Sequence, residues 1–193
     1  MNLQVETAWR LHRFLSERKI PYVISGGFAV QRWGQPRLTR DVDLTILLPA
    51  GQEEPALREL LRAFPGRVDD ALQFAVLHRV LLVQVPGGSE ADITLGLQGY
   101  EEGVIVRAVD YDLGDGRAVR LCSAEDLIIH KAVAGRPQDL MDIQGIVARQ
   151  RDRLDLAYLR RWLSEFSALL DDSEVGQRFE RAWEEYQKRI KAP

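Results

Sequence analysis

The segment that most constrains this chain is DVDLTILL, residues 41–48, in which polar and apolar side chains alternate. Such alternation predicts a β-strand with one buried face, because successive side chains of a strand point to opposite sides. Val42 is expected to face the core, so Asp41 and Asp43 share the other face with Cβ atoms ~7 Å apart. Two carboxylates placed in this way repel each other unless a positive group lies between them. Hard divalent cations such as Mg²⁺ suit this position, since they prefer oxygen ligands.

A third carboxylate with the same pattern follows in EADITLG, residues 90–96. Asp92 stands in a predicted strand whose Ile93 and Leu95 are expected to face the core. Carboxylates on neighbouring strands can hold two metal ions ~4 Å apart, an arrangement that clamps the attacking and leaving oxygens in phosphoryl transfer. An isolated Asp-x-Asp pair is more often simply solvated, so the hypothesis of a nucleotide–metal site rests on the combination of motifs.

Two glycines, Gly26 and Gly27, stand between a short predicted strand and a short predicted helix. Backbone N–H groups at the start of a helix bind phosphate anions, and the absence of side chains leaves them accessible. Ser25 could add a hydroxyl contact, and Arg37 or Arg40 in the following loop could neutralise phosphate charge. A Gly-Gly pair here is also common in an ordinary turn.

The remaining pattern predicts an α+β fold with a helical C-terminal region. A strand is expected over 79–85, and a hairpin of strands 103–111 and 117–123 is expected around the turn Asp115-Gly116. Further helices are expected over 3–19, 53–64, 123–133, from Pro137 onward, 155–170 and 174–190. We predict an α/β core in residues 1–100, and a hairpin plus helical region in residues 101–193.

The composition predicts a globular cytoplasmic protein. Of the 193 residues, 46% are hydrophobic and 28% are charged, which is enough for a core and argues against disorder. No apolar run approaches the ~20 residues that span a bilayer, and the N-terminus lacks the pattern of a signal peptide, so no membrane partner is expected. The single cysteine, Cys122, excludes an internal disulfide framework, and with three scattered histidines it makes no zinc site. A net charge of −3 gives no global attraction to nucleic acid.

The order Gly-Gly, then Asp-x-Asp, then a third carboxylate on a later strand resembles the nucleotidyltransferases of the DNA polymerase beta-like superfamily, over residues 20–96. The resemblance implies a mixed sheet flanked by helices. It also implies transfer of a nucleoside monophosphate from an NTP to an acceptor hydroxyl, with two Mg²⁺ ions as cofactors and Mn²⁺ as the alternative. Asp41 and Asp43 would bind both ions, and Asp92 would bind the catalytic ion and help to deprotonate the acceptor. Gly27 departs from the many relatives that have serine at this position.

A second block, SAEDLIIHKAVAGRPQDLMDI over residues 123–143, resembles the helical block of the AbiEii-type nucleotidyltransferases. These are the toxin half of bacterial toxin–antitoxin and phage-defence pairs. The matching positions are Lys131, Arg136, Asp139 and Asp142. Lys131 would reach the triphosphate, and the other three would line or shape the nucleotide site. Gln138 departs from the family, which often has lysine there. The resemblance implies a toxin acting on the 3′ end of tRNA, with an antitoxin as partner.

Other interpretations stay open at this point. Small antibiotic nucleotidyltransferases share the same front half, so an aminoglycoside or a lincosamide is an alternative acceptor, and a protein is another. A non-catalytic nucleotide-binding module is an alternative of a different class. The helical block also has a structural interpretation, in which Lys131 lies on an exposed helix face, Asp139 favours a helix start and Asp142 is a solvated charge.

Overall fold

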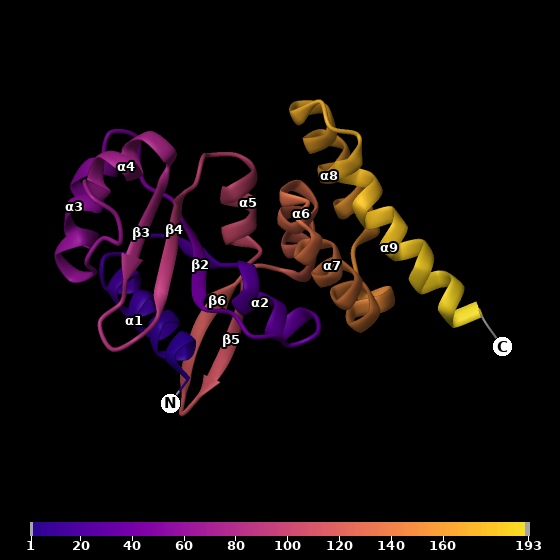
Figure 1. Cartoon of the computed structure of the whole chain (residues 1–193), viewed down its shortest axis with the longest axis horizontal. Coiled ribbons are helices and arrows are strands. Elements are labelled where there is room, and N and C mark those ends of the chain that lie inside the picture. The colour runs from indigo at the N-terminus through magenta and orange to yellow at the C-terminus, as the bar shows by residue number, and fades with distance from the viewer. Residues whose placement is uncertain (1, 192–193) are drawn as a thin grey trace. The chain divides into compact units, whose positions relative to one another are not determined.

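One six-stranded mixed sheet, in the order β3-β4-β2-β1-β6-β5, is formed by strands between residues 22 and 121 (Figure 1). The strands are β1 (Tyr22–Ile24), β2 (Asp41–Ile46), β3 (Val80–Gln84), β4 (Glu90–Leu95), β5 (Val109–Gly114) and β6 (Arg117–Leu121). β2 runs parallel to β4 and antiparallel to β1, while β1 runs parallel to β6. The predicted α+β fold class with a mixed sheet is confirmed.

The computed structural model describes residues 2–191, and contacts group these residues into two units. The first unit comprises the described residues up to Phe28 together with Leu38–Cys122, and the second comprises Ala29–Arg37 and the described residues from Ser123 onward. The β5–β6 hairpin belongs with the sheet because β6 pairs with β1. The predicted boundary after residue 100 stays a prediction.

Helices cover the apolar face of the sheet. They are α1 (Leu3–Glu17), α3 (Glu53–Ala63) and α4 (Ala71–His78). Leu11 of α1 and Leu57 of α3 are fully buried in one core with Val42, Leu44 and Ile46 of β2. The strand therefore turns its apolar side chains toward these helices and its polar side chains away from them, as the alternating pattern predicts.

Two segments differ from the sequence-based expectation. Helix α4 is not predicted from the pattern of residues 71–78. The predicted strand 103–111 is wrong over its first part, because residues 103–106 complete helix α5 (Tyr100–Val106). Val104 and its β-branched successors favour a strand, but the fold buries Tyr100 and Val104, which share one helical face at a spacing of four. The hairpin turn is confirmed, since Asp115 and Gly116 have φ values of 56° and 72°, as a type I′ turn requires.

Helices form the second unit. They are α6 (Ala124–Ala134), α7 (Pro137–Gln150), α8 (Leu156–Leu170) and α9 (Glu174–Lys191), with a short 3₁₀ turn at Arg151–Arg153. Ser123 caps α6 through Asp126 N (3.0 Å), Gly135 ends it at a φ of 63°, and Pro137 begins α7, as predicted. None of the helices within residues 2–191 is long and apolar enough to cross a membrane.

Helix α2 (Gly26–Trp33) begins in the first unit and ends in the second. Its last turn and the loop that follows it pack on α7. Arg149 of α7 donates to the carbonyl of Gly34 (2.8 Å), and Gln150 donates to the carbonyl of Trp33 (2.7 Å). The loop approaches α7 closely at Gly145, where a Cβ atom would lie 3.2 Å from the backbone nitrogen of Gln35.

Candidate active site

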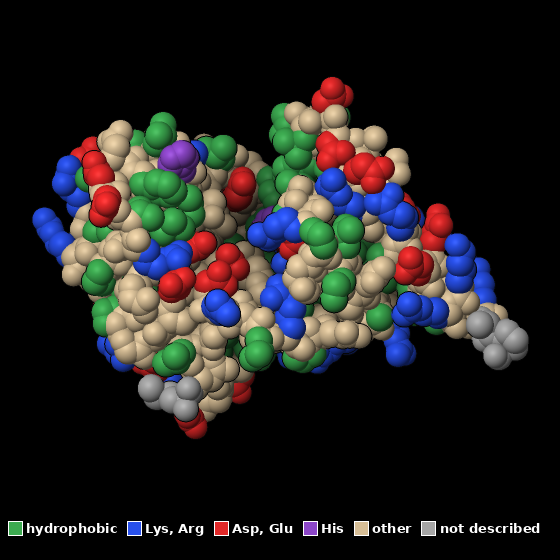
Figure 2. Space-filling model, in the orientation of Figure 1, with side chains coloured by type: hydrophobic (Ala, Val, Ile, Leu, Met, Phe, Trp, Pro, Cys, Tyr) green, Lys and Arg blue, Asp and Glu red, His purple; other side chains and the backbone are tan. Residues whose placement is uncertain are grey.

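Strands β2 and β4 carry four carboxylates on one face of the sheet. The two strands are parallel neighbours, with Asp41 opposite Glu90 and Asp43 opposite Asp92. Because residues two apart share a face, these side chains lie on the side opposite the buried Val42. In Figure 2, acidic side chains gather on the surface of the first unit over these strands, with basic side chains beside them.

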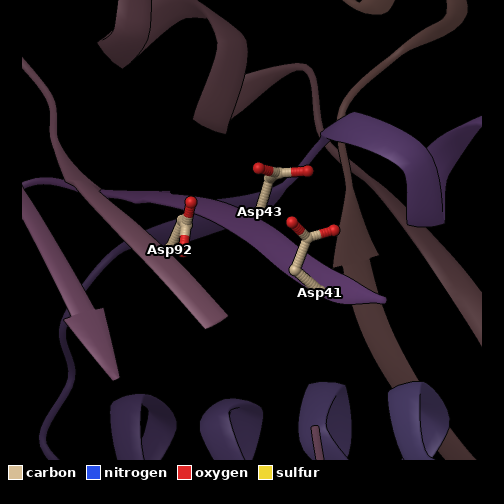
Figure 3. A group of neighbouring side chains, drawn as sticks. All are labelled: Asp41, Asp43 and Asp92. Carbon is tan, nitrogen blue, oxygen red and sulfur yellow. The ribbon is translucent and has the colours of Figure 1, made fainter. Parts of the chain in front are cut away.

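Three of these carboxylates come close enough to share a cation. Asp41, Asp43 and Asp92 each offer one carboxylate oxygen, and these oxygens lie within 4.8 Å of one another. Figure 3 shows the first two on one strand and the third on its neighbour. All three side chains are half-buried. A donor set made only of carboxylate oxygens fits Mg²⁺ or Mn²⁺, with positions left for water and phosphate oxygens. We call these three residues the carboxylate triad.

Gly26 lies directly against Asp43. Its φ is 58°, in the left-handed region that favours glycine, and a Cβ atom there would lie 2.7 Å from Asp43 Cβ and would overlap the carboxylate. The backbone nitrogen of Ser25 donates to the carbonyl of Asp43 (2.9 Å), which joins the end of β1 to β2. The first turn of α2, whose N–H groups have no acceptor within a helix, therefore starts beside the triad.

Thr39 fixes the orientation of Asp41. Its Oγ1 donates to Asp41 Oδ1 (3.0 Å), while its own carbonyl accepts a hydrogen bond from Gln4 Nε2 of α1 (2.6 Å). The loop before β2 is thus tied to a helix and to the carboxylate that it precedes. Thr39 was missed from the sequence, although its position two residues before Asp41 is a signal for a contact on the same face.

Arg67 contacts the triad from a loop and was also missed. Its Nη1 lies 2.6 Å from Glu90 Oε2, and its Nη2 binds Asp92 Oδ1. Burial raises the pKa of Asp92 above its usual range, the negative charges of Asp41 and Glu90 add to this effect, and Arg67 opposes it. Asp92 is therefore a stronger base than an ordinary aspartate.

The second unit contains five of the predicted site residues in one cluster, which we call the ion-pair network: Arg37, Lys131, Arg136, Asp139 and Asp142. Lys131 Nζ lies 2.7 Å from Asp139 Oδ1 and 2.9 Å from Asp142 Oδ2. Arg37 binds both oxygens of Asp142 at 2.9 Å, and Arg136 Nε lies 2.6 Å from Asp139 Oδ2.

The structural interpretation that left Lys131 on an exposed helix face and Asp142 in solvent is wrong. The two residues are 5% and 4% exposed, and Asp139 is 1% exposed. Burial alone would raise the pKa of Asp139, but hydrogen bonds from Arg136 and Lys131 outweigh it and hold the pKa below its usual range. The same balance, with hydrogen bonds from Arg37 and Lys131, holds the pKa of Asp142 low.

The other predicted residues are placed as follows. Gln138 donates to Asp142 Oδ1 (3.2 Å). Arg40 is exposed and directly precedes Asp41 in the chain, while Ser25 is half-buried. The structure thus brings together Gly26 and the carboxylate triad in the first unit, and the ion-pair network in the second.

The fold is similar to two solved structures. One is an antigenic nucleotidyltransferase-like protein from Paracoccidioides brasiliensis, at a TM-score of 0.53 and 21% identity, over 90% of this chain and 92% of that chain. The other is the lincomycin-bound lincosamide antibiotic adenylyltransferase LnuA, at a TM-score of 0.53 and 14% identity, over 76% of this chain and 98% of that chain. At these identities the similarity shows the fold. No curated protein matches the chain.

Residues 10–191 match the family described as "Nucleotidyltransferase of unknown function (DUF6036)". The match covers most of the chain and includes both the carboxylate triad and the ion-pair network. It confirms the resemblance at the level of nucleotidyltransferases, while the narrower AbiEii-type assignment stays a prediction. The chain is therefore a nucleotidyltransferase and belongs to the DUF6036 family.

Proposed function

We propose that the protein transfers a nucleoside monophosphate from an NTP to an acceptor hydroxyl and releases pyrophosphate. The observation that carries this proposal is the carboxylate triad packed against Gly26 at the start of α2. It joins, within one unit, oxygen ligands for a cation and backbone donors for a phosphate. Membership of a nucleotidyltransferase family supports the same reaction class.

The triphosphate would bind at the first turn of α2. The N–H groups of Gly26 and Gly27 are donors for phosphate oxygens, and the positive end of the helix dipole adds to the attraction. The absence of a side chain at Gly26 leaves room for the carboxylate of Asp43 directly beside the start of α2. Gly27 lacks the serine hydroxyl of many related proteins but keeps its backbone donor, and Ser25 could supply a hydroxyl.

The carboxylate triad would hold the divalent cation, with Mg²⁺ expected and Mn²⁺ as the alternative. Bound there, the cation would supply positive charge beside the phosphoryl group and its leaving oxygen. The protein holds the carboxylates that would bind the cation in fixed positions. Thr39 orients Asp41, and the pairing of β2 with β4 sets Asp43 opposite Asp92. Such positioning carries much of the catalysis in phosphoryl transfer.

Asp92 is the carboxylate suited to take the proton of the acceptor hydroxyl. Burial raises the pKa of Asp92, which favours a role as a base, and its carboxylate belongs to the triad. The oxygen of the acceptor would then attack the α-phosphate while the bond to the pyrophosphate oxygen breaks.

The AbiEii resemblance predicts nucleotide-binding roles for residues of the ion-pair network, and these predictions are separate from those for the carboxylate triad. In that resemblance Lys131 would reach the triphosphate, and Arg136, Asp139 and Asp142 would line or shape the nucleotide site. Arg37 and Arg40 are expected, from their place in the loop after the two glycines, to neutralise phosphate charge. Lys131 donates to Asp139 and lies near Asp142, so its charge already has two partners. A role in supporting the second unit explains these contacts without a nucleotide.

Two classes of acceptor are proposed. The AbiEii resemblance favours the 3′ end of tRNA, in a toxin with a cognate antitoxin. A small hydroxylated antibiotic is the second candidate, and it is favoured by the similarity in fold to a lincosamide antibiotic adenylyltransferase. A protein acceptor and a non-catalytic nucleotide-binding role are the remaining alternatives.

The test is a transfer assay with each of the four α-labelled NTPs, Mg²⁺, and either total tRNA or a panel of lincosamides and aminoglycosides. Label on one acceptor class would identify the substrate. Asp43→Asn should abolish transfer, and Asp69→Asn, at an exposed position of the same unit, should leave it unchanged. An Asp43→Asn protein with wild-type activity would contradict the proposal, as would the absence of metal-dependent NTP binding.

A further inference from the structure

Arg67 reaches the triad from beyond the edge of the sheet. Residues 65–67 lie along the outer side of β3, where Gly66 forms a bridge with Val83 and Arg67 N donates to the carbonyl of Leu82 (3.0 Å). Because β3 separates this segment from β4, a side chain must cross a whole strand to reach the carboxylates of β4. Strands are ~4.8 Å apart, so this position requires a long side chain.

The guanidinium of Arg67 binds two carboxylates at once. Nη1 contacts Glu90 and Nη2 contacts Asp92 Oδ1, while Nε is buried and, within residues 2–191, has no hydrogen-bond partner. Arginine is suited to this position because its planar group is always charged and carries several N–H donors in a fixed fork. The side chain is only 24% exposed, so its charge is partly shielded from water.

The charges on this face of the sheet are unbalanced. Asp41, Asp43, Glu90 and Asp92 bring four negative charges to two neighbouring strands. The guanidinium of Arg67 neutralises part of this charge, and it does so at an oxygen of Asp92. That residue is also the member of the triad contributed by β4.

We propose that Arg67 competes with a divalent cation for Asp92 and thereby sets how tightly the triad binds metal. The inference rests on the proposed function in one respect, that the triad binds a divalent cation. With Arg67 in place, the free protein holds a lone cation weakly. A cation that arrives already bound to the phosphates of an NTP has further ligands and is favoured, so Arg67 couples metal binding to nucleotide binding.

The size of the effect follows from Coulomb's law. The repulsion between a single positive charge and a divalent cation ~6 Å apart raises the Kd of the cation about tenfold, even with the dielectric constant of water. Partial burial makes the repulsion larger, and the competition for Asp92 acts in the same direction. Removal of the charge of Arg67 should therefore tighten metal binding, whereas a purely structural role for Arg67 would make its removal weaken metal binding.

The test is a titration of the nucleotide-free protein with Mn²⁺, followed by electron paramagnetic resonance or calorimetry. Arg67→Gln should bind Mn²⁺ about tenfold more tightly than wild type. Arg67→Lys, which keeps the charge, should stay closer to wild type than Arg67→Gln does. Arg67→Gln binding that is unchanged or weaker would overturn the inference.

A second variant keeps the test valid if Arg67→Gln fails to fold. Glu90→Gln removes a negative charge and leaves the guanidinium to Asp92 alone, so it should weaken Mn²⁺ binding. Glu54→Gln, on the exposed side of α3, is the matched control and should leave Mn²⁺ binding unchanged. Equal affinities of Glu90→Gln and wild type would count against the inference.

Failure of the inference can be told apart from failure of the proposed function. If Asp43→Asn binds Mn²⁺ as well as wild type does, the triad is not the metal site and both fail. If Asp43→Asn loses binding while Arg67→Gln does not tighten it, the metal site stands and only the inference about Arg67 fails.

Discussion

Replacement of Lys131 by methionine should lower the free energy of unfolding of the second unit by about 3 kcal/mol. Methionine is close to lysine in length and is apolar, so it leaves the buried space filled and removes only the charge. The ammonium group sits 2.7 Å from Asp139 and 2.9 Å from Asp142, whose carboxylates are almost completely buried. Removal of the ammonium group leaves the negative charges of the two buried carboxylates without full compensation.

The magnitude follows from the partners that remain. Loss of one partner of a buried ion pair typically costs about 3–5 kcal/mol. Each carboxylate keeps an arginine in this variant, Arg37 at Asp142 and Arg136 at Asp139, so the lower end of that range applies. Arg136 itself has a side chain that is 73% exposed, so Arg136→Gln should cost only about 1 kcal/mol or less.

Urea denaturation followed by tryptophan fluorescence is a suitable assay. Three of the four tryptophans, Trp33, Trp162 and Trp183, belong to the second unit, so the signal reports mainly on that unit. Arg136→Gln is the matched control, since it removes one charge from the rim of the same network. The reasoning is refuted if the free energy of unfolding of the Lys131→Met protein lies within about 1 kcal/mol of wild type, because the two buried carboxylates would then not depend on the charge of Lys131.

Three further predictions concern the two sites. Gly26→Ala should displace Asp43 and reduce transfer activity at least about 100-fold. Gly51 has a φ of 78° and open space around it, so Gly51→Ala should show only backbone strain, and equal activities of the two variants would contradict the role of Gly26. Thr39→Val should lower kcat about tenfold with little change in unfolding temperature, because Asp41 loses the hydrogen bond that orients it; steady-state kinetics measure this effect. The two buried carboxylates of the ion-pair network have lowered pKa values in the folded state. Their stabilising contribution is therefore complete above about pH 4 and is lost as the pH falls through those lower values. Denaturation curves between pH 2 and pH 6 should show this loss, and flat stability over that range would contradict it.

The carboxylate triad was predictable because its signal is local. Alternation along β2 puts Asp41 and Asp43 on one face whatever the strand pairs with, and the same rule applies to Asp92. The same alternation could also have identified Glu90, which stands two residues before Asp92 on the same face. The register that sets Asp43 opposite Asp92 depends on which strands are neighbours in the sheet, and this cannot be predicted from the pattern within one strand.

Long-range contacts account for most of what was not predicted. Arg67 lies in a loop, and its contact with Asp92 depends on a strand that lies between them. Burial of Lys131 had a detectable signal, because its helix is apolar on almost every side, with Leu127, Ile128 and Ile129 all fully buried. A helix of this kind lies inside a protein, so a lysine within it needs a buried partner.

The division of the chain also affects the order in which the second unit can fold during synthesis. Residues 29–37 belong to that unit, yet they leave the ribosome long before its other helices. Arg37 precedes its partner Asp142 by 105 residues, which corresponds to about 5–20 s at typical rates of translation. Throughout this interval the segment has no α7 to pack against. A fragment of residues 123–193 lacks Arg37 and the loop that lies against Gly145, so we expect it to be less stable than the same helices in the whole chain.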